Sequence, residues 1–152
     1  MKKKIILVVL AALYLGYSVY NTKKTRELEF AISYSAVGAG TWDKTIRLCD
    51  KLLKYIPNHP DVNYEKAIAL MQLGKYQESI EPCNLVIKYH YIAKRSWFLN
   101  NAYYKRARSL VQLGRLEEAL ESCDLAIKHG YDHRSVYFLR NEILMALGRF
   151  PG

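Results

Sequence analysis

Four glycines recur along this 152-residue chain at the spacing of a helical repeat unit. Gly40 and Gly74 are 34 residues apart, as are Gly114 and Gly148, and the middle interval is 40 residues. A period of this length is typical of proteins built from similar supersecondary units. Because one such unit cannot bury its own apolar face, we expect the units to stack into a continuous core. Stacked repeats usually present binding surfaces, so the period favours a partner-binding role over catalysis.

The residues around the glycines repeat as well. Sixteen residues beginning at Leu73 align with sixteen beginning at Leu113, and eight of these pairs are identical. A cysteine follows nine residues after each of the first three glycines, at Cys49, Cys83 and Cys123. An aromatic residue stands ten residues before each of the four glycines, at Phe30, Tyr64, Tyr104 and Phe138. Agreement at several positions across several copies indicates a true repeat.

Apolar residues recur at helical spacing on both sides of each glycine. Before Gly114 they include Tyr103, Ala107 and Leu110, and after it Leu116, Ala119, Leu120 and Cys123. Intervals of three and four residues form an apolar stripe along one face of an α-helix. Each unit is therefore predicted to be a pair of amphipathic helices joined by a tight turn at the glycine, which tolerates backbone angles that other residues avoid.

The unit resembles the tetratricopeptide repeat (TPR). The matching features are the small residues Ala67 and Ala107, the Leu-Gly turns, and Ala119, Ala126 and Pro57 at favoured positions. The resemblance implies an all-α, right-handed superhelix of helix-turn-helix hairpins with a concave groove. It covers about residues 26–150 and divides a TPR-like domain, 26–152, into units 26–59, 60–99 with an insertion, 100–133 and a half-repeat 134–152.

Six additional residues enter between the second and third units, within residues 89–99. This stretch carries Tyr91, Lys94, Arg95, Trp97 and Phe98. One interpretation is a longer loop or helix whose aromatic side chains pack into the core. The other is a protruding edge that contacts a partner.

The N-terminus carries a charge-free run, residues 5–20, between Lys2, Lys3 and Lys4 on one side and Lys23, Lys24 and Arg26 on the other. A helix of this length spans about 24 Å, slightly less than a usual membrane span. We expect an N-terminal hydrophobic helix that anchors the chain in a membrane, with residues 1–25 as the single-pass anchor and its flanks. A cleaved signal peptide of an exported TPR protein is an alternative, and a buried helix of a soluble domain is another.

Two features of the sequence give opposite indications of the side of the membrane on which the repeats lie. A short basic N-terminus usually stays in the cytoplasm, which places the repeats on the extracytoplasmic side. The three cysteines occupy equivalent positions in hairpins that stack about 10 Å apart, beyond the ~7 Å Cα separation that a disulfide allows. Unpaired buried thiols are more typical of a reducing compartment. We expect the extracytoplasmic location.

The charge of the chain argues against nucleic acid as a partner. The formal net charge is +9, but residues 1–26 contain six of the 23 basic residues and none of the 14 acidic ones. The remaining basic cluster, Lys105, Arg106 and Arg108, fans over different faces of one helix and is expected to be solvated. No arrangement typical of a metal site, a phosphate loop or a catalytic nucleophile is present, so we expect no metal, no cofactor and no enzymatic activity.

The resemblance also implies a binding surface, because the first helix of each TPR hairpin lines the concave face. The residues expected on this groove are Phe30, Tyr34, Tyr64, Ile68, Met71, Tyr104, Arg108, Val111 and Phe138. This set is aromatic and aliphatic and favours an extended or helical peptide bound through apolar side chains. It lacks the Lys and Asn residues of TPRs that grip acidic chaperone tails. For the four aromatics ten residues before each glycine, packing within the fold is the alternative role.

These observations predict a membrane-anchored TPR adaptor that binds a protein or peptide partner. The alternative is a self-assembling scaffold that associates through the last helix, residues 134–147. The apolar side of that helix is expected to be only partly covered, at Val136, Leu139, Ile143 and Leu144. An exposed apolar helix face predicts contact with another copy or a partner helix.

Overall fold

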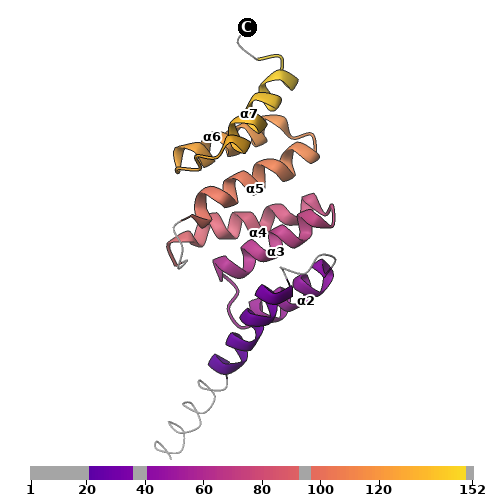
Figure 1. Cartoon of the computed structure of the whole chain (residues 1–152), viewed down its shortest axis with the longest axis vertical. Coiled ribbons are helices and arrows are strands. Elements are labelled where there is room, and N and C mark those ends of the chain that lie inside the picture. Colours follow the sequence, from indigo (N-terminus) through magenta and orange to yellow (C-terminus); the bar gives the residue numbers. More distant parts are fainter. Residues whose placement is uncertain (1–20, 36–40, 93–96, 150–152) are drawn as a thin grey trace, which may run out of the picture.

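The computed structural model describes residues 21–35, 41–92 and 97–149, and every regular element in these ranges is helical (Figure 1). A helix over residues 21–35 precedes the labelled elements. These are α2 (Trp42–Leu53), α3 (Pro60–Gln72), α4 (Tyr76–Tyr89), the short 3₁₀ helix η1 (His90–Ile92), α5 (Phe98–Gln112), α6 (Leu116–Lys128) and α7 (Arg134–Ala146). The prediction of an all-α chain is confirmed over these residues.

The helices form hairpins that stack along the long axis of the molecule (Figure 1). Helix 21–35 pairs with α2, α3 with α4, and α5 with α6, while α7 packs on the third hairpin. Gly74 and Gly114 turn the chain between the paired helices with a φ of 71° in both cases. The same bond closes both turns: Lys75 N–H donates to Leu70 C=O at 2.9 Å, and Arg115 N–H to Leu110 C=O at 3.0 Å. Gly40 lies outside the described residues.

The stack has two edges, which differ in the kind of connection that they contain. The connections between hairpins lie at one edge, on the left in Figure 1, and the glycine turns within hairpins lie at the other, on the right. We call the first the inter-hairpin edge and define it as residues 51–61, 88–91, 97–98 and 128–134. The hairpin-turn edge comprises residues 41–44, 72–78, 112–118 and 146–149. Helix 21–35 begins at the inter-hairpin edge, as do α3, α5 and α7.

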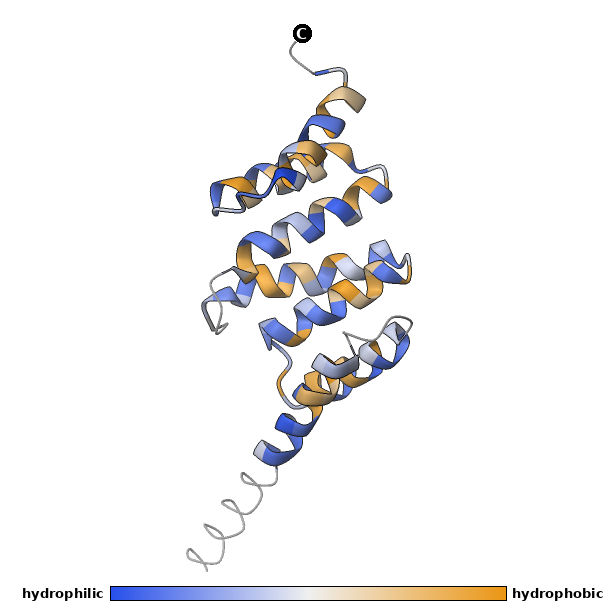
Figure 2. Ribbon diagram, viewed as in Figure 1, coloured by the Kyte–Doolittle hydropathy of each residue, from blue (hydrophilic) through white to orange (hydrophobic). Residues whose placement is uncertain are grey.

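The apolar helix faces meet in three successive clusters rather than in one central core. Leu28, Ile32 and Leu52 join the first hairpin to α3, and Tyr64, Val86 and Phe98 join the second hairpin to α5. A third cluster combines α5, α6 and α7 around Ala107, Leu110, Cys123, Val136 and Ile143. Hydrophobic and hydrophilic residues accordingly alternate along each helix in Figure 2. Each hairpin thus depends on its neighbour for burial, as the repeat pattern predicts.

The insertion adds aromatic residues at the start of α5. Phe98 is buried, and its ring stands edge-on to Tyr64 with centroids 5.1 Å apart. Trp97 stacks on Phe98 at 4.4 Å but stays 39% exposed, and Tyr91 is 71% exposed. Lys94 and Arg95 lie outside the described residues. The first interpretation therefore holds for Phe98, which enters the core. Contact of this stretch with a partner stays a prediction.

The three cysteines are buried and free, as the sequence predicts. Burial raises the pKa of the Cys49, Cys83 and Cys123 thiols to about 12. The expected N-terminal hydrophobic helix falls in residues 1–20, outside the described part of the chain. Among the residues that are described, no helix has the length and apolar character needed to cross a membrane.

Candidate functional site

A hollow of about 470 Å³ lies between α5 and α7. We call it the α5–α7 hollow; it is lined by Tyr104, Arg108, His133, Arg134, Ser135, Phe138, Leu139 and Glu142. Two aromatic side chains line it: Phe138, which is 64% exposed, and Tyr104, which is half-buried. The Tyr104 ring is held in place by stacking on Tyr131, with centroids 4.8 Å apart. A fixed aromatic surface beside an exposed cation suits the side chains of a peptide.

A smaller hollow of about 70 Å³ extends the same surface toward the glycine turns. Met71, Tyr76, Val111 and Gln112 line it together with Arg108 and Leu139, which also border the α5–α7 hollow. Two shared residues make the hollows neighbours, so α3, α5 and α7, with Tyr76 at the start of α4, contribute to one groove. This arrangement brings Met71, Tyr104, Arg108, Val111 and Phe138 together, all of which the sequence places on the concave face.

The other four predicted groove residues occupy different settings. Tyr64 is only 6% exposed and packs against Phe98 and Trp97, so it stabilises the fold, which was the alternative role. Ile68 packs beside it against the same cluster. Phe30 and Tyr34 are 75% and 76% exposed on helix 21–35 and line none of the hollows described here.

A polar hollow of about 160 Å³ near the first hairpin is absent from the sequence-based prediction. Helix 21–35 contributes Glu29, Ile32 and Ser33, and α3 contributes Asp61, Val62 and Glu65. His59 Nε2 lies 3.3 Å from Glu29 Oε1 at its rim. Three carboxylates around one hollow disfavour an anionic ligand. The spacing of these three residues along the chain matches no motif. Their proximity is therefore visible only once the helices are stacked.

Charge is distributed unevenly around the groove. Burial lowers the pKa of Lys105, and the neighbouring Arg108 lowers it further, while Glu65 opposes both effects. Arg108 itself is exposed, and Glu142 lies on the opposite wall of the α5–α7 hollow. The groove therefore offers two exposed cations, Arg108 and Arg134, beside aromatic side chains and the carboxylate of Glu142.

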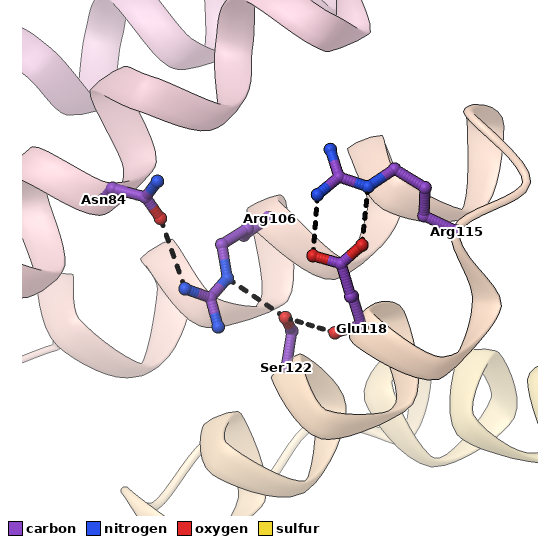
Figure 3. A network of polar contacts seen from close by, with 5 residues as sticks. All are labelled: Asn84, Arg106, Arg115, Glu118 and Ser122. Atoms are coloured by element: carbon purple, nitrogen blue, oxygen red, sulfur yellow. Dashed lines mark hydrogen bonds and ion pairs between the residues drawn. The ribbon is translucent and has the colours of Figure 1, made fainter.

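The Arg106 side chain extends between α4 and α6 (Figure 3). Its Nε donates to Ser122 Oγ at 3.0 Å, and its Nη1 donates to Asn84 Oδ1 at 3.2 Å. Nearby, Arg115 forms a bidentate pair with Glu118 at 2.7 and 2.6 Å. The prediction that Lys105, Arg106 and Arg108 fan over different faces is confirmed. The prediction that all three are solvated is wrong, because Arg106 bridges two hairpins and Lys105 is half-buried.

The last helix is better covered than the sequence suggests. Val136 and Ile143 are 0% and 1% exposed because they pack into the cluster formed with α5 and α6. The expectation that these two are only partly covered is therefore wrong, while Leu139 and Leu144 are partly exposed as expected. The exposed apolar residues of α7 are instead Tyr137, Phe138 and Met145.

One position on α7 departs from the repeat. Asn141 occupies the phase of the buried residues Ala67 and Ala107, and its side chain is exposed. In the earlier hairpins the alanine allows the second helix to pack closely on the first. An exposed amide at this phase makes the outer face of α7 more polar than the corresponding face of α3 or α5.

Comparisons with known proteins agree with this architecture. The model of a family described as "Tetratricopeptide repeat" matches residues 101–152. No curated protein matches the sequence significantly. This match supports the resemblance to the tetratricopeptide repeat for residues 101–152, about a third of the chain.

Solved structures extend the likeness over most of the molecule. The chain is similar to the first TPR of Spaghetti (RPAP3) bound to the HSP90 peptide SRMEEVD, with 22% identity, a TM-score of 0.71, and coverage of 83% of this chain and 94% of that one. It is similar to MamA, with 17% identity, a TM-score of 0.74, and coverage of 84% and 66%. It is also similar to the TPR2B domain of yeast Sti1 in a complex with pHsp70, with 21% identity, a TM-score of 0.68, and coverage of 82% and 98%. At these identities the likeness establishes the TPR fold.

Proposed function

We propose that this protein is a membrane-anchored TPR adaptor that binds a peptide segment of a partner protein in the groove formed by α3, α5 and α7. The observation that carries this proposal is the α5–α7 hollow, where Tyr104, Arg108 and Phe138 surround a space of about 470 Å³. Two proteins of the same fold were solved with chaperone peptides bound, which supports a peptide as the ligand class.

The chemistry of the groove indicates the kind of peptide. Phe138 and the Tyr104 ring offer an apolar surface for a bulky side chain. Aromatic and Arg side chains contribute most of the binding energy in many interfaces, and truncating one commonly costs about 2 kcal/mol or more. Arg108 and Glu142 then favour a peptide with a polar or charged residue next to that apolar anchor.

Membrane attachment is the second part of the proposal and rests on residues 1–25. The charge-free run 5–20 and its basic flanks fit a single-pass anchor with the repeats on the extracytoplasmic side. An anchor would hold the groove at a membrane surface, where a tethered partner segment meets it at high effective concentration.

Selection of peptides on the full chain tests the groove. A phage-displayed random library is selected on the protein in neutral phosphatidylcholine nanodiscs, and the affinities of the selected peptides are measured by fluorescence anisotropy. We expect Phe138→Ser to weaken binding at least about tenfold and Arg108→Gln to weaken it less. The matched control, Tyr55→Ser, removes an exposed aromatic ring outside the groove and should leave the affinity unchanged. Equal affinities for wild type and Phe138→Ser would refute the groove assignment.

Self-association through α7 is the second candidate function. It is favoured by the exposure of Tyr137 and Met145, which are 42% and 65% exposed on this helix. Under this alternative, Tyr137→Ser combined with Met145→Ser lowers the oligomer size in analytical ultracentrifugation. Under the adaptor proposal, Phe138→Ser alone weakens peptide binding and leaves the oligomer size unchanged.

A further inference from the structure

The inter-hairpin edge differs from the hairpin-turn edge in its exposed apolar side chains. The described residues include ten exposed large hydrophobic side chains, and four of them lie on the inter-hairpin edge: Tyr55, Ile56, Tyr91 and Trp97. The hairpin-turn edge carries only Leu113 among these ten. Three of the four are Tyr or Trp, the residues that concentrate where a bilayer meets water.

The charges of the two edges differ in the same sense. The inter-hairpin edge has five basic residues, Lys51, Lys54, Lys88, Lys128 and Arg134, against two acidic ones, Asp61 and Asp132. The hairpin-turn edge is balanced, with Lys44, Lys75, Arg115 and Arg149 against Asp43, Glu78, Glu117 and Glu118. A lysine near a helix C-terminus is explained by the helix dipole alone. The dipole gives no reason for exposed aromatic rings between the lysines.

The path of the chain places the same edge next to the proposed anchor. Helix 21–35 begins at the inter-hairpin edge (Figure 1), and residue 21 directly follows the charge-free run 5–20. Lys23 and Arg26, in the first turns of this helix, are exposed, as is the acidic Glu27. The hairpin-turn edge lies at the far ends of the same helices.

We propose that the inter-hairpin edge is a membrane-contacting surface that lies against anionic lipid headgroups, with Tyr55, Ile56, Tyr91 and Trp97 at the depth of the headgroups and the lysines paired with lipid phosphates. Basic residues are attracted to anionic headgroups in whichever leaflet faces the repeats, and aromatic side chains partition into the interfacial layer. This inference builds on the proposed anchor, because contact at the edge fixes the tilt of the stack and keeps the hairpin-turn edge away from the bilayer.

The test measures the proximity of each edge to lipid in the full chain. Nanodiscs are made of phosphatidylcholine alone or of phosphatidylcholine mixed with phosphatidylglycerol, each with a trace of lipid carrying a headgroup nitroxide. A bimane fluorophore is attached to Asn58→Cys on the inter-hairpin edge or to Gln77→Cys on the hairpin-turn edge, both exposed positions. The native cysteines are buried and stay unlabelled.

We expect the nitroxide to quench the fluorophore at position 58 in anionic nanodiscs and to leave that at position 77 unquenched. K54Q combined with K88Q should reduce the quenching, because each lysine lost weakens lipid contact about fivefold. K44Q combined with K75Q is the matched control, with the same charge change on the opposite edge and no expected effect. Equal, weak quenching at positions 58 and 77 in a chain that stays in the nanodisc would overturn the proposal.

If the proposed anchor is wrong, the experiment gives a result that differs from failure of the edge proposal. A chain without an anchor elutes apart from phosphatidylcholine nanodiscs in size-exclusion chromatography, which refutes the anchor regardless of the quenching data. The edge is then tested by co-sedimentation of the full chain with phosphatidylglycerol vesicles. Binding that K54Q with K88Q weakens, and K44Q with K75Q does not, supports the edge, and the absence of binding refutes it.

Discussion

The hydroxyls of Ser79 in α4 and Ser109 in α5 lie 2.7 Å apart and join the second hairpin to the third. Both side chains are fully buried. Ser79 donates its only hydroxyl proton to the carbonyl of Tyr76 at 2.7 Å, so Ser109 must be the donor to Ser79. A polar pair in an otherwise apolar contact therefore satisfies its own hydrogen bonds and fixes the register between the two hairpins.

This pair predicts a non-additive effect on stability. Ser79→Ala leaves the Ser109 hydroxyl buried without its acceptor and should cost about 1–3 kcal/mol. Ser109→Ala leaves the Ser79 proton bonded and should cost less, about 1 kcal/mol. The double substitution should cost less than the sum of the two, as measured by urea unfolding of the full chain. Strict additivity would show that the two hydroxyls do not interact in solution.

The three cysteines predict slow thiol chemistry. Burial holds the pKa of each thiol at about 12, so very little thiolate exists at pH 8. With a free cysteine titrating near 8.5, the native thiols should react with a disulfide reagent roughly 10³-fold more slowly than an exposed thiol. The number of reacted thiols is measured from the absorbance of the released product. In denaturant, all three thiols should react rapidly. Rapid reaction of one thiol in the native chain would place it at the surface.

Removing the charge of Lys105 should increase the stability of the fold by an amount that depends on pH. Because burial and Arg108 lower its pKa in the folded state, the protonated lysine destabilises the fold at neutral pH. As pH rises, the folded state loses the proton before the unfolded state does, and the cost disappears as pH passes the unfolded value of about 10.4. Lys105→Met should therefore raise the free energy of unfolding at pH 7.

The gain from Lys105→Met should shrink at alkaline pH. Urea unfolding at pH 7 and at pH 10 and above measures it, and Lys75→Met, at an exposed lysine, is the control without an expected gain. A loss of stability at pH 7 would mean that the attraction of Glu65 for Lys105 outweighs the cost of burial.

A buried and an exposed residue of α7 should differ in how much their truncation destabilises the fold. Ile143 is 1% exposed within the third apolar cluster, and Ile143→Ala should cost about 2–5 kcal/mol in unfolding free energy. Met145 is 65% exposed, and Met145→Ala should change stability by less than about 0.5 kcal/mol. Thermal unfolding of both variants measures the difference. Comparable losses would show that the outer face of α7 is covered, as the self-association alternative requires.

Much of the fold is predictable from the sequence because the repeat constrains it several times over. The glycine spacing, the cysteine phase and the apolar stripes each indicate paired helices, and they agree. Gly74, Gly114 and Gly148 all adopt the positive φ that the turn requires. The buried free thiols follow from the same phases, since equivalent positions in stacked hairpins cannot meet.

The site is less predictable because residues at the same position of the repeat have different neighbours in different hairpins. Tyr64 and Phe138 share one phase, yet Tyr64 is buried and Phe138 is exposed. The insertion supplies Trp97 and Phe98 to cover Tyr64, whereas no described residue covers Phe138 in the same way. The network of Arg106 with Asn84 and Ser122 likewise depends on which helices meet in space, which no local pattern encodes.

The most direct test of the central claim is site-specific photocrosslinking in intact cells. The photoreactive residue p-benzoylphenylalanine is placed at Phe138, within the α5–α7 hollow, or at Tyr55, outside it, and crosslinked products are identified by mass spectrometry. A partner that crosslinks from position 138, not from position 55, and is displaced by a peptide of its own sequence is the result that the account predicts. The same products from both positions, or none from position 138 in a chain that is folded and membrane-bound, would contradict it.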